Sequence, residues 1–364
     1  MIPVYKPHFN GLEKKYVNEC LDSTWISSKG KYIDLFEANF SKFIGAKFST
    51  TTSNGTTALH LAMVALGIKA GDEVIVPTFT YVASVNTILQ IGAIPVFVDS
   101  DPETLQICTK DAANKITEKT AAIMAVHLYG HPCDMDPLVK LCEENKLFLI
   151  EDAAEAFGTQ YKGQYAGTFG DVATFSFFGN KTITTGEGGM VVCKSQEVYE
   201  KACHIKNQGV SKTKEYWHDD LAFNYRMTNI QAAIGYAQLQ TANDVIARKR
   251  AIALSYQSNL ADLPLSTHKE QPNCFHTYWM CSVILDDAKI REPLRNYLKE
   301  HGIDTRPFFP CVNTMPHCST DDIFESASKI SLSGFNLPSY PDLTDEEIKH
   351  ISEVIRTFFN ELSK

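Results

Sequence analysis

The sequence lacks any long apolar run. None of its 364 residues belongs to an uninterrupted apolar stretch approaching the roughly 18 residues that suggest a membrane span. Its N-terminal segment also lacks a basic region leading into an apolar one, the pattern of a secretory signal. We therefore expect no membrane span and a cytoplasmic location.

Metal-binding and basic patterns are missing as well. The ten cysteines are scattered, with no Cys-x-x-Cys pair and no His-Cys cluster at zinc spacing, so we expect reduced, mostly buried thiols and no metal. The net charge is −9, and the 34 lysines and arginines are interspersed with acids, which disfavours a nucleic-acid surface. Any anionic ligand must therefore be bound by a local site.

The chain has no internal repeat and no low-complexity linker, and its 44% hydrophobic composition supports a large core. Between residues 46 and 200, Val- and Ile-rich runs alternate with longer helical patterns. This alternation predicts an α/β fold with a mostly parallel sheet and helices on both faces. The predicted strands lie within residues 72–79, 93–100, 120–129, 147–154, 171–178 and 188–193.

The second half predicts a smaller α+β unit. Residues 229–260 are apolar-periodic without proline, which predicts one long connecting helix. A strand over 277–285 and a helix over 292–302 follow. Thr344 and Glu347 then fit a capping box at the start of a C-terminal helix.

These patterns divide the chain into two predicted domains. The large domain covers residues 1–240, including an N-terminal arm, and the smaller C-terminal domain covers residues 241–364.

Asp152 is the first candidate functional residue. It ends an apolar strand, at the carboxyl edge of the sheet where ligands of α/β proteins bind. A carboxylate there can pair with a pyridinium nitrogen and keep a cofactor ring able to accept electrons. The same position also suits an ordinary helix N-cap.

Ser176 lies near the end of the next predicted strand and Lys181 follows it, and both precede the glycine-rich run 184–189. Glycine has no side chain, so the backbone there can turn tightly beside a bound ring. A single lysine is most often a solvated charge, and a glycine-rich turn is most often a hairpin. The combination of Asp152, Ser176 and Lys181 after successive strands is much rarer, and it favours a cofactor site.

Two further segments extend this candidate site. Gly55 and Thr56 open a predicted helix, where free N–H groups and hydroxyls suit a phosphate, although ordinary capping uses the same residue types. Phe79 and Tyr81 lie at the end of another strand, and an aromatic ring there can stack on a heteroaromatic ring or fill the core or its rim.

Several motifs occur in a fixed order almost from end to end: SNGTTALHLA, GDEVIVPTFTYVAS, IEDAAEAFGT, FSFFGNKTITTGEGG and NYRMTNIQAAIG. They resemble the successive motifs of the DegT/DnrJ/EryC1/StrS family of nucleotide-sugar aminotransferases. The resemblance implies the type I fold of aminotransferases that use pyridoxal 5'-phosphate (PLP), with pyridoxamine 5'-phosphate as the alternating form. It also implies a homodimer whose subunits share their active sites.

By position, the resemblance makes Lys181 the lysine that carries the cofactor. Asp152 pairs with the pyridine nitrogen, and Tyr81 stacks on the ring. Glu155 lies near the phenolic oxygen of the cofactor, where many members have Gln or His.

The cofactor phosphate has its own set of matching residues. Gly55, Thr56 and Ser176 match the phosphate cup. Asn224 matches a residue that the neighbouring subunit supplies to this phosphate, with Arg226 close by.

The same resemblance implies transfer of an amino group from an amino acid, with glutamate the expected donor, to the 4-keto group of a nucleotide-linked 4-keto-6-deoxy sugar. Glu155 and the runs 176–191 and 301–309 are most similar to members that convert GDP-4-keto-6-deoxy-D-mannose to its 4-amino product for O-antigen synthesis.

The loop around residues 306–318 leaves the sugar contacts open. Arg306 and Phe308 either face the nucleotide sugar or have a structural role. Asn313 and Cys318 depart from the His and Tyr usual in similar enzymes.

Other functions have less support. A UDP- or dTDP-linked keto sugar is an alternative acceptor. PLP-dependent sugar dehydratases of the GDP-sugar branch carry His in place of the lysine, so Lys181 disfavours them. A nicotinamide-dependent oxidoreductase would need a Gly-x-Gly-x-x-Gly run after an early strand, which the sequence lacks. Retention of Asp152 and Lys181 disfavours a non-catalytic protein of the same fold.

Overall fold

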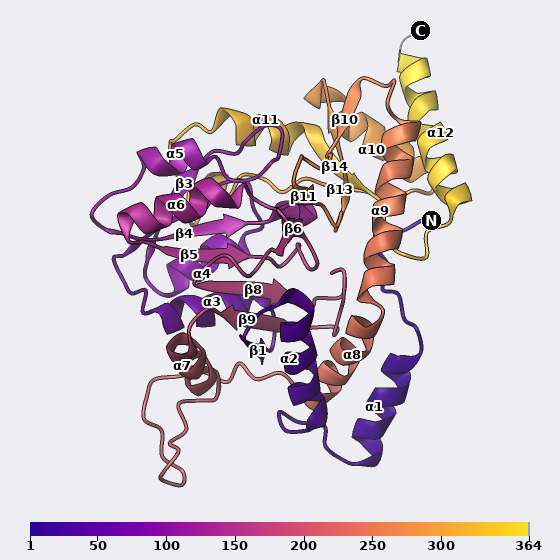
Figure 1. The fold of residues 1–364 in the computed structure, drawn as a ribbon. Coiled ribbons are helices and arrows are strands. Elements are labelled where there is room, and N and C mark those ends of the chain that lie inside the picture. Colours follow the sequence, from indigo (N-terminus) through magenta and orange to yellow (C-terminus); the bar gives the residue numbers. More distant parts are fainter. Residues whose placement is uncertain (363–364) are drawn as a thin grey trace.

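The computed structural model describes residues 1–362 and contains the predicted alternation of strands and helices (Figure 1). Its largest sheet has seven strands in the order β1-β9-β8-β5-β4-β2-β3. Neighbours from β8 to β3 are parallel, and only β9 runs antiparallel to its two neighbours. The predicted mostly parallel sheet is thus confirmed. The strands are β1 (Phe48–Thr52), β2 (Glu73–Pro77), β3 (Ile94–Val98), β4 (Thr120–Val126), β5 (Phe148–Asp152), β8 (Val172–Ser176) and β9 (Gly189–Cys193).

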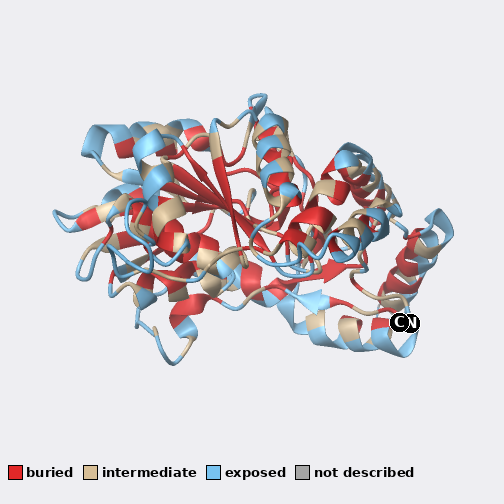
Figure 2. Cartoon of the chain, turned by 90° about the horizontal axis from the view of Figure 1, so that it is seen from below, coloured by how far each residue is buried: buried red, intermediate tan, exposed pale blue. Residues whose placement is uncertain are grey.

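Helices cover both faces of this sheet because successive strand residues point to opposite sides. Val74 and Val76 pack with α3 (Gly55–Leu66), α4 (Ala83–Gln90) and α7 (Gln196–Lys206). Ile75, between them, packs with α5 (Thr109–Asn114) and α6 (Met135–Asn145). Phe175 and Met190 pack with α2 (Lys31–Ile44) and α8 (Asn229–Gln240). Figure 2 shows the buried strands between helices whose outer faces are exposed.

The C-terminal part forms the predicted smaller α+β unit around an antiparallel sheet. Its strand order is β10-β12-β14-β13, and its own core lies between this sheet and helices α9, α10 and α12. The predicted capping box opens α12, where Thr344 N donates to Glu347 Oε2 at 2.9 Å and Glu347 N donates to Thr344 Oγ1 at 3.1 Å. The elements are α9 (Ala242–Asn259), β10 (Leu265–Thr267), β12 (Cys281–Leu285), α10 (Arg291–Glu300), β13 (Arg306–Pro307), α11 (Glu325–Ser333), β14 (Gly334–Leu337) and α12 (Asp345–Leu362).

The prediction of one continuous helix over 229–260 is wrong at Thr241. There the backbone leaves helical geometry (φ −115°, ψ 12°) and separates α8 from α9. Asn10 of the N-terminal arm donates a side-chain hydrogen bond of 2.9 Å to Thr241 Oγ1, so the break lies where the arm crosses the helix pair. The arm continues into α1 (Leu12–Asp22), which packs beside α8 (Figure 1).

A small three-stranded sheet links the two halves of the chain. Strand β11 (Cys274–Phe275) pairs with β6 (Gln160–Tyr161), which pairs with β7 (Gln164–Tyr165). Trp279 and Phe308 also join the core cluster of the large sheet. The domain boundary at residue 240 therefore stays a prediction. Among the helices of residues 1–362, none is long and apolar enough to cross a bilayer.

Candidate active site

A cavity of about 530 Å³ lies at the carboxyl edge of the large sheet. The last residues of β4, β5 and β8 line it, together with the first turn of α3. Parallel strands bring their carboxyl ends to one edge, so residues distant in sequence meet there. The predicted residues that line this cavity are Gly55, Thr56, Tyr81, Asp152, Glu155, Ser176 and Lys181.

Lys181 places its amine among two carboxylates and an aromatic ring. Nζ lies 3.5 Å from Glu155 Oε1 and 3.8 Å from the centroid of the Trp279 ring. Burial lowers the pKa of Lys181, and the charges of Glu155 and Asp152 oppose that shift. The amine is therefore more readily neutral than an ordinary lysine, as a nucleophile or base must be.

Asp152 is buried and held by two hydrogen bonds. Ser84 Oγ donates to Oδ2 at 2.7 Å, and Ala154 N donates to Oδ1 at 3.1 Å. Burial raises the pKa of Asp152, and both bonds oppose the increase by stabilising the ionised form. A carboxylate buried at a cavity wall favours a cationic N–H partner within the cavity.

Glu155 is oriented by the turn Leu128–Gly130. Tyr129 adopts left-handed backbone geometry (φ 57°), which is uncommon for a residue other than glycine, and its N–H donates to Glu155 Oε2 at 2.8 Å. Burial raises the pKa of Glu155 to about 7, with Lys181 opposing. Glu155 can therefore gain or lose a proton near neutral pH.

The start of α3 lies unusually close to the end of β8. A Cβ atom on Gly55 would lie 2.8 Å from Ser176 Cβ, so only glycine allows this approach. Asn54 and Thr57 form a capping box that fixes the first turn of the helix. The first N–H groups of a helix lack partners within the helix, and here they adjoin the Ser176 hydroxyl. This donor set fits a phosphate group.

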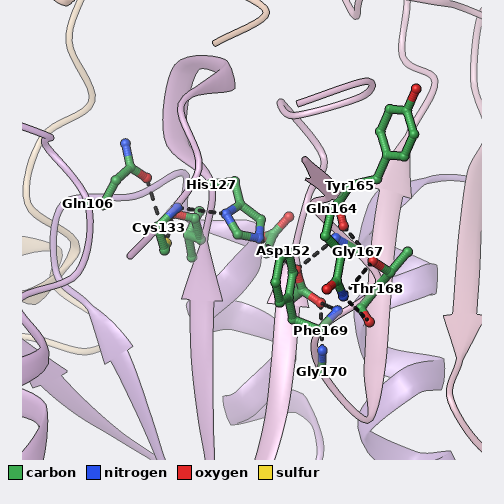
Figure 3. Close-up of polar contacts among 12 residues, drawn as sticks. Gln106, His127, Cys133, Asp152, Gln164, Tyr165, Gly167, Thr168, Phe169 and Gly170 are labelled. Carbon is green, nitrogen blue, oxygen red and sulfur yellow. Dashed lines mark hydrogen bonds and ion pairs between the residues drawn. The ribbon is translucent and has the colours of Figure 1, made fainter. Parts of the chain in front are cut away.

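A second buried network supports the strand that carries Asp152 (Figure 3). The fully buried Glu151 carboxylate accepts hydrogen bonds of 2.7 to 3.0 Å from Gly167 N, Phe169 N, Gly170 N and His127 Nε2. His127 Nδ1 accepts from Cys133 N at 3.0 Å, which places the ring proton on Nε2. His127 N also donates to Asp152 O at 3.0 Å, so the network fixes the backbone at Asp152.

Asn224 and Arg226 lie outside the cavity of their own chain. Asn224 is exposed, and Arg226 Nη1 donates to Asn207 Oδ1 at 2.7 Å. Lys181 is the single Lys or Arg among the described residues that line the cavity, whereas Asp152, Glu155 and Glu187 are all acidic.

The predicted substrate residues near position 306 also lie away from the cavity. Arg306 is exposed and donates to Asp304 Oδ1 at 2.9 Å. Phe308 is 3% exposed and packs in the core against Tyr129, so its position does not support a sugar contact. The next residue, Phe309, lines the cavity instead.

Asn313 and Cys318 both make hydrogen bonds within this chain. Asn313 is buried and accepts a hydrogen bond of 2.6 Å from Thr78 Oγ1. The thiol of Cys318 donates to Val312 O at 3.2 Å.

Ser84, Tyr129 and Trp279 also line or support the site, and sequence reasoning missed them. Ser84 belongs to a quoted motif but has no distinctive spacing, and Trp279 falls within a predicted apolar strand. Their contacts with Asp152, Glu155 and Lys181 arise only when distant segments pack together.

Comparison with known proteins agrees with this geometry. Residues 8–356 match the DegT/DnrJ/EryC1/StrS aminotransferase family. The chain is 56% identical over 361 residues to GDP-perosamine synthase of Escherichia coli O157:H7, covering 99% of both chains. It is 54% identical over 365 residues to GDP-perosamine synthase of Vibrio cholerae, covering 99% of this chain and 100% of the relative.

A solved structure is similar over nearly the whole fold. The putative sugar aminotransferase Spr1654 of Streptococcus pneumoniae, in its PLP form, superposes with a TM-score of 0.94 at 27% identity, covering 99% of each chain. The type I fold and the PLP cofactor expected from the sequence are thereby confirmed. We conclude that the chain is a PLP-dependent transaminase that belongs to the DegT/DnrJ/EryC1/StrS aminotransferase family.

Proposed function

We propose that this enzyme transfers the amino group of glutamate to GDP-4-keto-6-deoxy-D-mannose, giving GDP-perosamine for O-antigen synthesis. The single observation that carries the proposal is the high identity to two GDP-perosamine synthases over almost the whole chain. The position of Lys181 in the cavity supports amine transfer in particular, because the side-chain amine of this lysine can move the proton that the transfer requires.

The residues of the cavity fit the cofactor. Asp152 would pair with its ring nitrogen, and Tyr81, which lines the cavity and is 56% exposed, would cover the ring. The N–H groups of Gly55 and Thr56, with the Ser176 hydroxyl, would bind its phosphate. When bound, PLP supplies an electron sink that stabilises negative charge at the carbon losing a proton.

Lys181 moves the proton in both halves of the reaction. Its neutral Nζ takes the proton from the α-carbon of the amino-acid donor. After the keto acid has left and the sugar has bound, Nζ returns a proton to the sugar carbon that receives the amine. Burial favours the neutral amine required for the first transfer, and Glu155 at 3.5 Å stabilises the protonated form that follows.

The charges of the cavity support a homodimer. The cofactor phosphate, the donor carboxylates and the nucleotide diphosphate are all anionic, yet the described cavity lining of one chain contributes a single Lys or Arg and three acids. A second copy can supply Asn224 and Arg226, which lie outside their own cavity. The segment 207–224 extends from the body below α7 (Figure 1) and carries Tyr216 and Leu221, which are 98% and 93% exposed. A second subunit would cover these apolar side chains.

A substrate panel tests the proposal. The purified enzyme is incubated with glutamate and with GDP-, UDP- or dTDP-linked 4-keto-6-deoxy sugars, and products are identified by mass spectrometry and NMR. We expect a 4-amino product from the GDP sugar and none from the folded Lys181→Ala variant. Preference for a UDP or dTDP sugar would refute the acceptor, and loss of the 3-hydroxyl without amine transfer would refute the reaction.

A further inference from the structure

Trp279 makes two separate contacts with the lysine segment. It lies just before β12 and is 4% exposed. Its indole Nε1 donates a hydrogen bond of 2.7 Å to the backbone carbonyl of Asn180. The face of the same ring lies 3.8 Å from Lys181 Nζ. One side chain therefore contacts both the backbone before the lysine and the reactive nitrogen itself.

The backbone of Trp279 is held rigidly by the turn that also orients Glu155. Gly130 adopts φ 93°, and a Cβ atom there would lie 2.8 Å from Trp279 N. Thr277 N donates to Gly130 O at 3.1 Å, and the Tyr129 ring stacks on the indole with an interplanar angle of 14°. These contacts fix the indole before any ligand binds.

A second distant segment holds the other side of the lysine. The hydroxyl of Tyr5, in the N-terminal arm, donates to the backbone carbonyl of Lys181. The carbonyls of residues 180 and 181 thus accept hydrogen bonds from two side chains that are far from them in sequence, Trp279 and Tyr5. Neither donor belongs to the large sheet on which the cofactor motifs lie.

The indole face of Trp279 has an electrostatic effect on Lys181 in addition to its packing contact. An aromatic face attracts a positive charge through its quadrupole, most strongly for tryptophan and in a desolvated site. Two other ionisable groups act on the Lys181 amine, Asp152 at the end of β5 and Glu155 just beyond it. Substitution of Trp279 removes neither of these carboxylates.

We propose that Trp279 is a positioning residue for Lys181, with its N–H holding the lysine segment and its ring face favouring the protonated nitrogen. The inference rests on the assignment of Lys181 as the lysine that carries the cofactor.

The test compares Trp279→Leu, which removes both contacts, with Trp279→Phe, which keeps an aromatic face but loses the N–H donor. Trp25→Phe is the matched control, because Trp25 is 55% exposed and lies outside the cavity. For each holoenzyme, the visible absorption of the cofactor is titrated with pH, and kcat and KM are measured. Borohydride reduction followed by peptide mapping checks that the cofactor remains on residue 181.

We expect Trp279→Leu to lower the pH midpoint of the absorption change by about 0.5 to 1 unit, because the positive charge at Nζ loses the indole face. Trp279→Phe should shift the midpoint by less than half as much, but kcat should fall several-fold with little change in KM. Trp25→Phe should match the wild type in every measurement.

A wild-type midpoint in labelled, folded Trp279→Leu would overturn the charge role. If that variant does not fold, Trp279→Phe decides the positioning role: an unchanged kcat overturns it. Absence of label on residue 181 in the wild type would instead refute the assignment of Lys181.

Discussion

Lys181, Glu155 and Asp152 are ionisable side chains with little exposure that share one small volume. Burial disfavours the charged form of each, whereas the opposite charges of the lysine and the two acids partly compensate one another. The hydrogen bonds of Asp152 and Glu155 indicate a different role for each acid. Asp152 accepts from Ser84 and Ala154, which stabilises its anion, whereas Glu155 keeps one oxygen directed at Lys181. Asp152 is therefore suited to a permanent charge and Glu155 to exchange of a proton.

This difference predicts a pH dependence of stability for Glu155. Its pKa is raised from an ordinary value of 4.5 to about 7 in the folded protein, so the folded state binds this proton more tightly than the unfolded state. Glu155 therefore contributes a loss of stability to the wild type as the pH rises from about 4.5 to about 7, and Glu155→Gln lacks this contribution. We expect the free energy of unfolding of Glu155→Gln to gain on the order of 1–3 kcal/mol over the wild type across this window.

Urea unfolding of the apoenzymes at a series of pH values measures this effect. Glu187→Gln, which removes an exposed carboxylate from the same cavity, is the control and should show no comparable divergence. Parallel curves for wild type and Glu155→Gln would contradict the raised pKa.

At the scale of elements, the start of α3 decides the geometry of the proposed phosphate site. Gly55→Ala adds a methyl group 2.8 Å from Ser176 Cβ. The first turn must shift to relieve this contact, although alanine is otherwise the better helix former. Displaced N–H groups bind phosphate poorly, so we expect the Kd for PLP to rise at least about tenfold, equivalent to roughly 1.4 kcal/mol.

Titration of the apoenzymes with PLP measures this change, and a double variant separates its cause. Ser176→Gly removes the Cβ atom that the added methyl group would strike, together with the hydroxyl. If the clash is the cause, Gly55→Ala should add nothing to the effect of Ser176→Gly. Additive effects would point to a different origin, and wild-type affinity in Gly55→Ala would refute the close packing.

Local patterns explain which elements could be predicted from the sequence. Six of the seven strands of the large sheet and the cap at Thr344 depend on periodicity and short-range spacing, whereas β1 (Phe48–Thr52) is not among the predicted strands. The cavity residues Asp152, Ser176 and Lys181 could be found because each follows a strand that ends at the same edge. Thr241, by contrast, breaks a helical pattern at a contact with the N-terminal arm, and no local signal marks it.

The site residues that could not be predicted from the sequence were missed for a different reason. Trp279 reaches Asn180, and Tyr5 reaches Lys181, across 99 and 176 positions of sequence. An aromatic residue in an apolar run is indistinguishable from an ordinary core residue until the chain is folded. Phe308 and Phe309 show the same limit, because which neighbour faces the cavity depends on packing against Tyr129.

At the scale of the whole molecule, the net charge of −9 and the acidic cavity pose one problem: anionic ligands must be attracted by few cations. The shared site that we propose would solve this problem by bringing groups from a second chain. In a two-fold symmetric dimer each subunit gives and receives the same residues, so both sites are completed at once. This arrangement makes the two sites separable by mutation.

Hybrid dimers provide the decisive measurement. Lys181→Ala and Asn224→Ala should each be inactive or nearly so as homodimers. In a hybrid, one cavity carries both substitutions, whereas the other combines an intact Lys181 with an intact Asn224 of the opposite subunit. Random exchange of equal amounts makes half of the dimers hybrids, so about a quarter of all sites should be intact, and activity should recover to about that fraction of the wild type.

The recovery distinguishes sharing from a local role of Asn224. If Asn224 served the cavity of its own chain, every hybrid would contain two defective sites, and mixing would restore nothing. Two differently tagged Lys181→Ala preparations, mixed in the same way, give the baseline, and native mass spectrometry of the tags shows that subunits have exchanged. Activity at that baseline, with exchange demonstrated, would contradict the shared site and leave the exposed segment 207–224 without its proposed partner.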